Sequence, residues 1–115
     1  MVSGTGVIEK RETTQTQIIQ YFVKVNKRFQ VDFELPASES ALEGGQKVTI
    51  AINTSKPKKS NALLTLRGEV YQIEKTSAGI RYIIFFSGLQ GSIVAKRGIT
   101  GLKTKKTIYL SISKR

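Results

Sequence analysis

The sequence predicts an all-β fold, an antiparallel β-barrel of about eight strands that takes up the whole chain, residues 1–115, as a single domain. Apolar side chains alternate with polar ones in several short segments, which is the pattern of strands that bury one face. Turn-forming residues separate these segments at short intervals, and 115 residues suit one domain with one core. Barrel closure would also hide the strand edges that an apolar all-β chain must protect.

Four strands are expected in the N-terminal half. They cover residues 5–12, 17–25, 28–35 and 46–53. The third and fourth alternate cleanly, and Phe29, Val31 and Phe33 face one way in the third. The second is apolar on both faces, so it should be covered on both sides, by a second layer or by a partner. Between the third and fourth strands, Ser38 can cap one helical turn that ends at Gly44.

Four more strands are expected in the C-terminal half. They cover residues 63–75, 79–86, 92–96 and 106–113. The first of them changes its inside–outside phase near Arg67 and Gly68, and a glycine at a phase change predicts a β-bulge there. Residues 76–79 predict a hairpin turn, and the strand after it is apolar on both faces. At this size and strand number the barrel is expected to be OB-like, the oligonucleotide/oligosaccharide-binding architecture.

The chain is strongly basic, and its charge is unevenly distributed. There are 19 Lys and Arg against 8 Asp and Glu, a net charge of +11, and residues 75–115 contain nine basic residues and no acid. A nucleic acid or an acidic protein surface as partner explains such a charge, and so does a solvated basic surface. The basic residues expected near a nucleic acid are Lys56, Lys58, Lys59, Lys96, Arg97, Lys103, Lys105 and Lys106. The aromatic residues that can stack on bases, if they do not pack the core, are Tyr21, Phe22, Tyr71, Tyr82, Phe85 and Tyr109.

The residue types argue against catalysis. The chain has no cysteine and no histidine, so it lacks thiolate metal sites and the commonest acid–base group. Its eight acids show no metal-ligand spacing, and no phosphate-binding loop motif is present. We therefore expect no catalytic residue, no metal and no cofactor. No apolar run reaches transmembrane length and the N-terminus lacks the features of a signal peptide, so a cytoplasmic location is expected.

The stretch FFSGLQGSIVAKRG, residues 85–98, contains a Gly-x-x-Gly motif from Gly88 to Gly91. In KH domains such a loop clamps a nucleic-acid backbone, and there it joins two helices. Here both flanks are β-like, which favours a bend between two strands. We expect Leu89 and Gln90 at the exposed tip of that bend.

Two motifs stand out in the C-terminal half. A Gly-x-Val-Tyr-x-Ile-Glu strand is formed by Gly68, Val70, Tyr71, Ile73 and Glu74. A Ser-Gly-Leu segment that runs to two basic residues and a glycine is formed by Ser87, Gly88, Leu89, Lys96, Arg97 and Gly98. Together they resemble the eighth-numbered small subunit of nuclear RNA polymerases and its shorter archaeal counterpart. Ser87 departs from the family's Gly-Gly pair, and residues 54–61 are basic where eukaryotic members have an acidic insertion, which fits an archaeal-type member.

The resemblance implies an OB-like, eight-stranded barrel that is a non-catalytic subunit of multisubunit DNA-directed RNA polymerase. Such a subunit would support assembly and stability by docking on the outside of the largest subunit, and it would be nucleoid-associated through the polymerase. The candidate partner contacts are the residues of the bend, Ser87, Gly88, Leu89, Gln90 and Gly91. The alternative is a free-standing OB-type protein that binds single-stranded nucleic acid, which the acid-free, basic C-terminal third supports.

Overall fold

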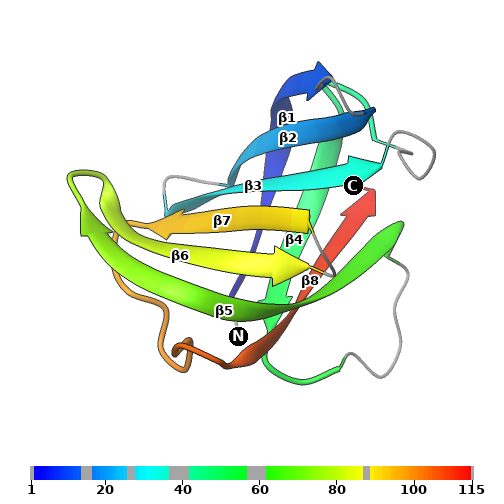
Figure 1. Cartoon of the computed structure of the whole chain (residues 1–115). Coiled ribbons are helices and arrows are strands. Elements are labelled where there is room, and N and C mark those ends of the chain that lie inside the picture. The colour runs from blue at the N-terminus through cyan, green and yellow to red at the C-terminus, as the bar shows by residue number, and fades with distance from the viewer. Residues whose placement is uncertain are drawn as a thin grey trace.

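The chain forms a closed β-barrel of eight antiparallel strands (Figure 1). The computed structural model describes residues 2–13, 17–25, 28–36, 42–56, 62–86 and 89–114. The strands are β1 (Val2–Thr13), β2 (Ile18–Val25), β3 (Phe29–Pro36), β4 (Lys47–Asn53), β5 (Leu64–Thr76), β6 (Gly79–Phe86), β7 (Leu89–Ala95) and β8 (Thr107–Lys114). Their order around the barrel is β1-β2-β3-β7-β6-β5-β8-β4, and β4 pairs with β1 to close it. The predicted all-β, OB-like barrel of about eight strands is therefore confirmed.

The barrel interior is filled by the apolar side chains that the alternation predicted. In β3, Phe29, Val31, Phe33 and Leu35 are buried, whereas the residues between them are partly or fully exposed. The interior residues of β4 and β8 follow the same rule. Burial of each such side chain contributes about 1.5–3 kcal/mol, so this filled interior is the main source of stability.

Buried side chains also close the two ends of the barrel. At one end the Tyr21 hydroxyl donates a hydrogen bond to the Leu42 carbonyl (3.2 Å), and Leu42 is buried. At the other end Ile99 and Leu102, from the segment between β7 and β8, are buried against the core. The interior is thus a packed core.

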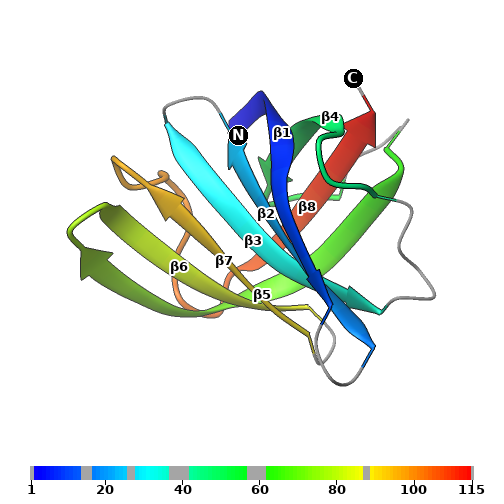
Figure 2. The same ribbon diagram turned by 90° about the horizontal axis from the view of Figure 1, so that it is seen from above.

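Strand β1 is longer than its predicted extent of 5–12, because its first residues pair with β4. Its first half pairs with β4, from Val2 opposite Ile52 to Val7 opposite Lys47, and its second half pairs with β2. A register shift between Ile8 and Lys10 marks an irregularity in the second half. The pairing of β1 with β4 closes the barrel, and the strands are tilted as a closed barrel requires (Figure 2).

The predicted bulge in β5 lies three residues after Gly68, at Tyr71. Val70 is opposite Ile84 and Gln72 is opposite Ile83, so Tyr71 has no opposite residue on β6. The extra residue reverses the phase, and Ile73 lies opposite the buried Tyr82. The prediction near Gly68 was wrong in position. The sequence shows only that the apolar residues change from one face of the strand to the other, and a bulge at Tyr71 produces the same change.

The predicted hairpin turn at residues 76–79 is confirmed. Thr76 ends β5 and Gly79 begins β6. The Thr76 hydroxyl accepts a hydrogen bond from the Ala78 amide (3.2 Å) and donates one to the Gly79 carbonyl (3.0 Å). Gly79 has a φ of 137°, a conformation that glycine tolerates best.

The helical turn expected from Ser38 to Gly44 falls mostly outside the described residues. Gly44 and Gly45 form a turn, and Gly45 has a φ of 82°. The described ranges contain only strands, turns and irregular segments. No helix long and apolar enough to cross a membrane is found in them.

Candidate functional site

The Gly-x-x-Gly stretch does not form a bend with Leu89 and Gln90 at its tip. Both residues already belong to β7, opposite Phe86 and Phe85 of β6. Leu89 is partly buried and packs against the core, and only Gln90 is exposed. Ser87 and Gly88, which separate β6 from β7 in the sequence, lie outside the described residues.

Gly91 is buried inside the β-sheet, between two neighbouring strands. It pairs with Phe33 of β3 and with Ile84 of β6. A Cβ at this position would lie 2.7 Å from the backbone oxygen of Asp32 and 2.9 Å from the Phe86 ring. The glycine is therefore needed for strand packing, and its role as a partner contact stays a prediction.

An exposed aromatic pair lies on the outer surface of β5 and β6. The rings of Tyr71 and Phe85 meet edge to face, with centroids 4.8 Å apart. Tyr71 is 54% exposed and Phe85 is 44% exposed, although both sit on strands. The bulge at Tyr71 places the two rings together, and the partly buried Ile83 lies two residues from Phe85 on β6.

The other predicted stacking residues are less available. Tyr21 and Tyr82 are buried in the core, where Tyr21 stacks on Phe33 and the Tyr82 hydroxyl accepts a hydrogen bond from the Ile99 amide (2.8 Å). Phe22 and Tyr109 are only partly exposed. Of the six aromatics, Tyr71 and Phe85 alone are exposed.

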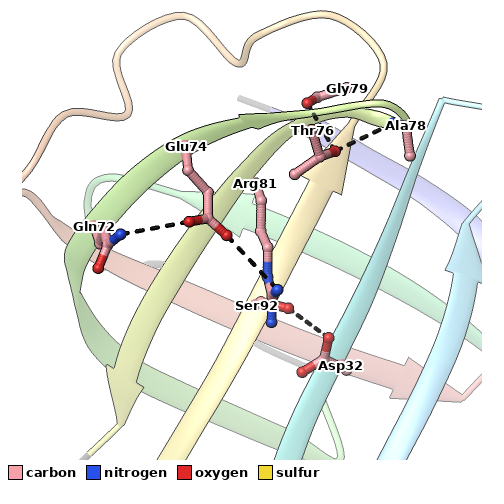
Figure 3. A network of polar contacts seen from close by, with 8 residues as sticks. All are labelled: Asp32, Gln72, Glu74, Thr76, Ala78, Gly79, Arg81 and Ser92. Atoms are coloured by element: carbon pink, nitrogen blue, oxygen red, sulfur yellow. Dashed lines mark hydrogen bonds and ion pairs between the residues drawn. The ribbon is translucent and has the colours of Figure 1, made fainter.

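A polar network runs across the outer surface of β3, β7, β6 and β5 (Figure 3). The Ser92 hydroxyl donates to the Asp32 carboxylate (2.5 Å), and Arg81 lies 3.7 Å from Glu74. Burial raises the pKa of Asp32 above its ordinary value, while the Ser92 hydrogen bond and the positive charge of Arg81 oppose that rise. The network lies beside the aromatic pair on β5 and β6, where Gln72 follows Tyr71.

Basic side chains gather at one end of the barrel. Because neighbouring strands are antiparallel, β2, β4, β5 and β7 end where β1, β3, β6 and β8 begin. This end, which we call the basic end, carries the exposed side chains of Lys24, Arg28, Lys56, Lys75, Lys96, Arg97, Lys103, Lys105 and Lys106. In Figure 1 the β5–β6 hairpin and the segment that follows β7 mark its left side. Six predicted basic residues are thus brought to one end, whereas Lys58 and Lys59 lie outside the described residues.

A hollow of about 360 Å³ opens in the basic end. Its lining residues are Lys24, Arg28, Phe29, Gln30, Ala78, Val94 and Lys96. We call it the basic hollow. Three of its side chains are cationic and none is acidic. A neighbouring hollow, which shares Lys24 and Gln30 with it, is lined by the acids Glu9 and Asp32, so the positive potential is weaker on that side.

Sequence reasoning missed Lys24 and Arg28 as site residues. Lys24 is a single charge near the end of an apolar strand, and Arg28 precedes the first residue of the next strand. Only the pairing of β3 with β7 brings Lys96 beside them, and the Lys96 amide donates to the Arg28 carbonyl (3.1 Å). This pairing joins strands about sixty residues apart, so no local sequence signal reveals it.

The described residues contain no group of three or more acids that could hold a metal ion. Three acids of the outer surface are bound to neighbours: Asp32 to Ser92, Glu74 to Arg81, and Glu34 to the Gln90 amide (2.9 Å). The described surface thus has two candidate binding features, the aromatic pair Tyr71–Phe85 and the basic end.

Comparison with known proteins gives a likeness of structure only. No protein-family model matches the chain, and no curated protein matches it. Among solved structures it is similar to the cytoplasmic molybdate-binding protein ModG in a crystal form with molybdate bound. The identity is 15%, the TM-score is 0.44, and the match covers 97% of this chain and 89% of that chain. Similarity at this level says nothing about what this chain binds.

Proposed function

We propose that the chain is a non-catalytic small subunit of a multisubunit DNA-directed RNA polymerase. It would dock on the largest subunit and support the assembly and stability of the transcription complex. The resemblance of residues 68–74 and 87–98 to the eighth-numbered small subunit motivates this proposal. The resemblance suggests the partner, and an exposed aromatic pair on the barrel surface supports a docking role.

The observation that carries the proposal is the exposed Tyr71–Phe85 pair. Within the first motif, Val70 is buried, and Gly68 lies so close to β6 that a Cβ there would be 2.7 Å from the Phe85 carbonyl oxygen. Gly68 and Val70 therefore serve the barrel itself. Tyr71 does not, because more than half of its surface is open to solvent.

An exposed aromatic pair on a regular strand is well suited to anchor a protein partner. Aromatic residues are enriched in the buried centre of protein interfaces, and Tyr is frequent among the side chains that carry most of the binding energy. Both rings are already held against each other in the free chain, so little side-chain freedom is lost on docking. The surrounding outer surface is polar, as the rim of an interface is, with Gln72, Glu69 and Gln90 next to the rings in the strand ladders.

The test is affinity purification of the tagged chain from the cells in which it is native. We expect the large catalytic subunits of RNA polymerase, identified by mass, in stoichiometric amount after a high-salt wash. The double variant Tyr71→Ser with Phe85→Ser should lose them, because two interface anchors cost about 2–4 kcal/mol together, roughly 30-fold to 1000-fold in affinity.

A matched control removes exposed apolar side chains elsewhere. Val7 is 39% exposed and Leu63 is 46% exposed, and neither contacts the pair in the strand ladders. The variant Val7→Ser with Leu63→Ser should retain the polymerase. If the unmodified chain elutes alone at moderate salt, the subunit proposal is wrong. If both variants retain the polymerase equally, the aromatic pair is not the docking surface.

A further inference from the structure

We propose that the basic hollow binds the phosphate backbone of a nucleic acid, independently of base sequence. The site is new relative to the predicted basic residues, because two of its three cations, Lys24 and Arg28, come from the N-terminal half of the chain. The proposal goes beyond the subunit role and does not depend on it. A free barrel and a barrel docked on a polymerase present the same hollow.

The cations of the basic hollow are held on a firm backbone frame. Lys24 lies near the end of β2, Arg28 immediately before β3, and Lys96 immediately after β7. The hydrogen bond from the Lys96 amide to the Arg28 carbonyl (3.1 Å) ties the last two together. The β5–β6 turn packs on the same backbone, since a Cβ at Gly79 would lie 2.8 Å from the Lys96 Cα. Three charges from three elements therefore point to a site that is formed before any ligand arrives.

Positive charge continues beyond the hollow along the segment between β7 and β8. This segment adds the exposed side chains of Arg97, Lys103, Lys105 and Lys106. Two backbone hydrogen bonds fix its far end to β5, from the Lys105 amide to the Val70 carbonyl (2.7 Å) and from the Val70 amide to the Lys106 carbonyl (2.9 Å). A single phosphate group would contact only the basic hollow. A continuous polyanion would contact both the hollow and the basic side chains of the segment between β7 and β8. The extent of the charge therefore favours a polymer.

The lining of the hollow favours a nucleic acid over an acidic protein segment. Protein partners are usually anchored by large apolar or aromatic side chains. None of the exposed large hydrophobic residues lines the hollow, and its one aromatic residue, Phe29, is 4% exposed. Lys, Arg and Gln, which are present, are the side chains that contact phosphates. The absence of an exposed ring in the lining predicts contact with the backbone and no stacking on bases.

The test is fluorescence anisotropy with the full chain, a labelled 20-nucleotide oligo-dT and a labelled 20-base-pair duplex. Affinity should fall linearly in a log–log plot against salt, because each phosphate contact releases bound counterions. The double variant Arg28→Gln with Lys96→Gln should reduce the slope by about 1.4 for oligo-dT, since each lost contact contributes about 0.7. Oligo-dA and oligo-dC of the same length should bind as oligo-dT does.

The control variant makes the same change of charge on another part of the barrel. Arg67 of β5 and Lys114 of β8 are exposed, and neither strand is adjacent to β2, β3 or β7. Arg67→Gln with Lys114→Gln should leave the salt slope within experimental error of the unmodified chain. If the salt slope falls equally in both double variants, the proposal is overturned, because net charge alone then explains binding. Complete displacement by inorganic phosphate, or equally tight binding of poly-glutamate, would also overturn it.

Discussion

Replacement of Gly91 by alanine tests whether the Gly-x-x-Gly motif serves folding or binding. The added Cβ would lie 2.7 Å from the Asp32 backbone oxygen and 2.9 Å from the Phe86 ring. The oxygen belongs to the neighbouring strand β3, which is held by hydrogen-bonded pairing on both sides and cannot move without disturbing the barrel. The substitution should therefore destabilise the fold.

The magnitude follows from two opposing effects. Overpacking of a rigid interior costs about 1–3 kcal/mol, and a clash with backbone places Gly91→Ala at about 2–3 kcal/mol. Alanine restricts the unfolded chain more than glycine, which offsets about 0.5–1 kcal/mol. The net loss is about 1–2.5 kcal/mol. With an unfolding entropy of about 2.1 cal/mol/K per residue, the chain should melt about 4–10 °C lower.

Thermal unfolding followed by circular dichroism measures this change, with two other glycines as controls. A Cβ at Gly98 would lie 3.0 Å from the end of the Ile80 side chain, which can rotate away, so Gly98→Ala should cost little. Nothing lies within 4 Å of a Cβ at Gly44, so Gly44→Ala should be neutral or slightly stabilising. If Gly91→Ala melts like the unmodified chain but loses a ligand or partner, the motif is a binding loop and our interpretation fails.

Two further substitutions test buried polar contacts. Tyr82→Phe leaves the Ile99 amide without its buried acceptor and should lower stability by about 1–3 kcal/mol; an unchanged melting temperature would contradict this. Burial raises the pKa of Asp32 from 3.8, so the native state holds that proton more tightly and the free energy of unfolding should fall as the pH rises above 3.8. Asp32→Asn should lack this fall, and a stability difference between the two proteins that is constant from pH 3 to 7 would refute it.

Most of the barrel could be predicted because alternation reports directly on burial. In β3, β4 and β8 every second residue faces the core, so each strand reveals its inner face without knowledge of its neighbours. The position of the bulge could not be found in this way. The same apolar residues fit a phase change at Gly68 or at Tyr71, and only the pairing of β5 with β6 decides between them.

The site residues were harder to predict because they depend on pairing between distant strands. Leu89 was expected at an exposed tip, since the flanking glycines Gly88 and Gly91 suggested a loop. Pairing with Phe86 instead extends β7 back to Leu89. Lys96 was identified from the charge of the C-terminal third, whereas its neighbours Lys24 and Arg28 were not. Charge along the sequence thus indicated only part of the basic hollow.

The two candidate surfaces, the aromatic pair and the basic hollow, are formed by different residues of the barrel. Along β6, Phe85 of the aromatic pair is followed on the same outer face by Ile83 and then by Arg81, which is opposite Val94 of the basic hollow. The Glu74–Arg81 ion pair and the Asp32–Ser92 hydrogen bond lie on these neighbouring strands (Figure 3). The proposed docking residues Tyr71 and Phe85 and the proposed phosphate-binding residues Lys24, Arg28 and Lys96 are different residues of one barrel. The proposed subunit role and the proposed nucleic-acid binding therefore do not exclude each other, and the two double variants test them separately.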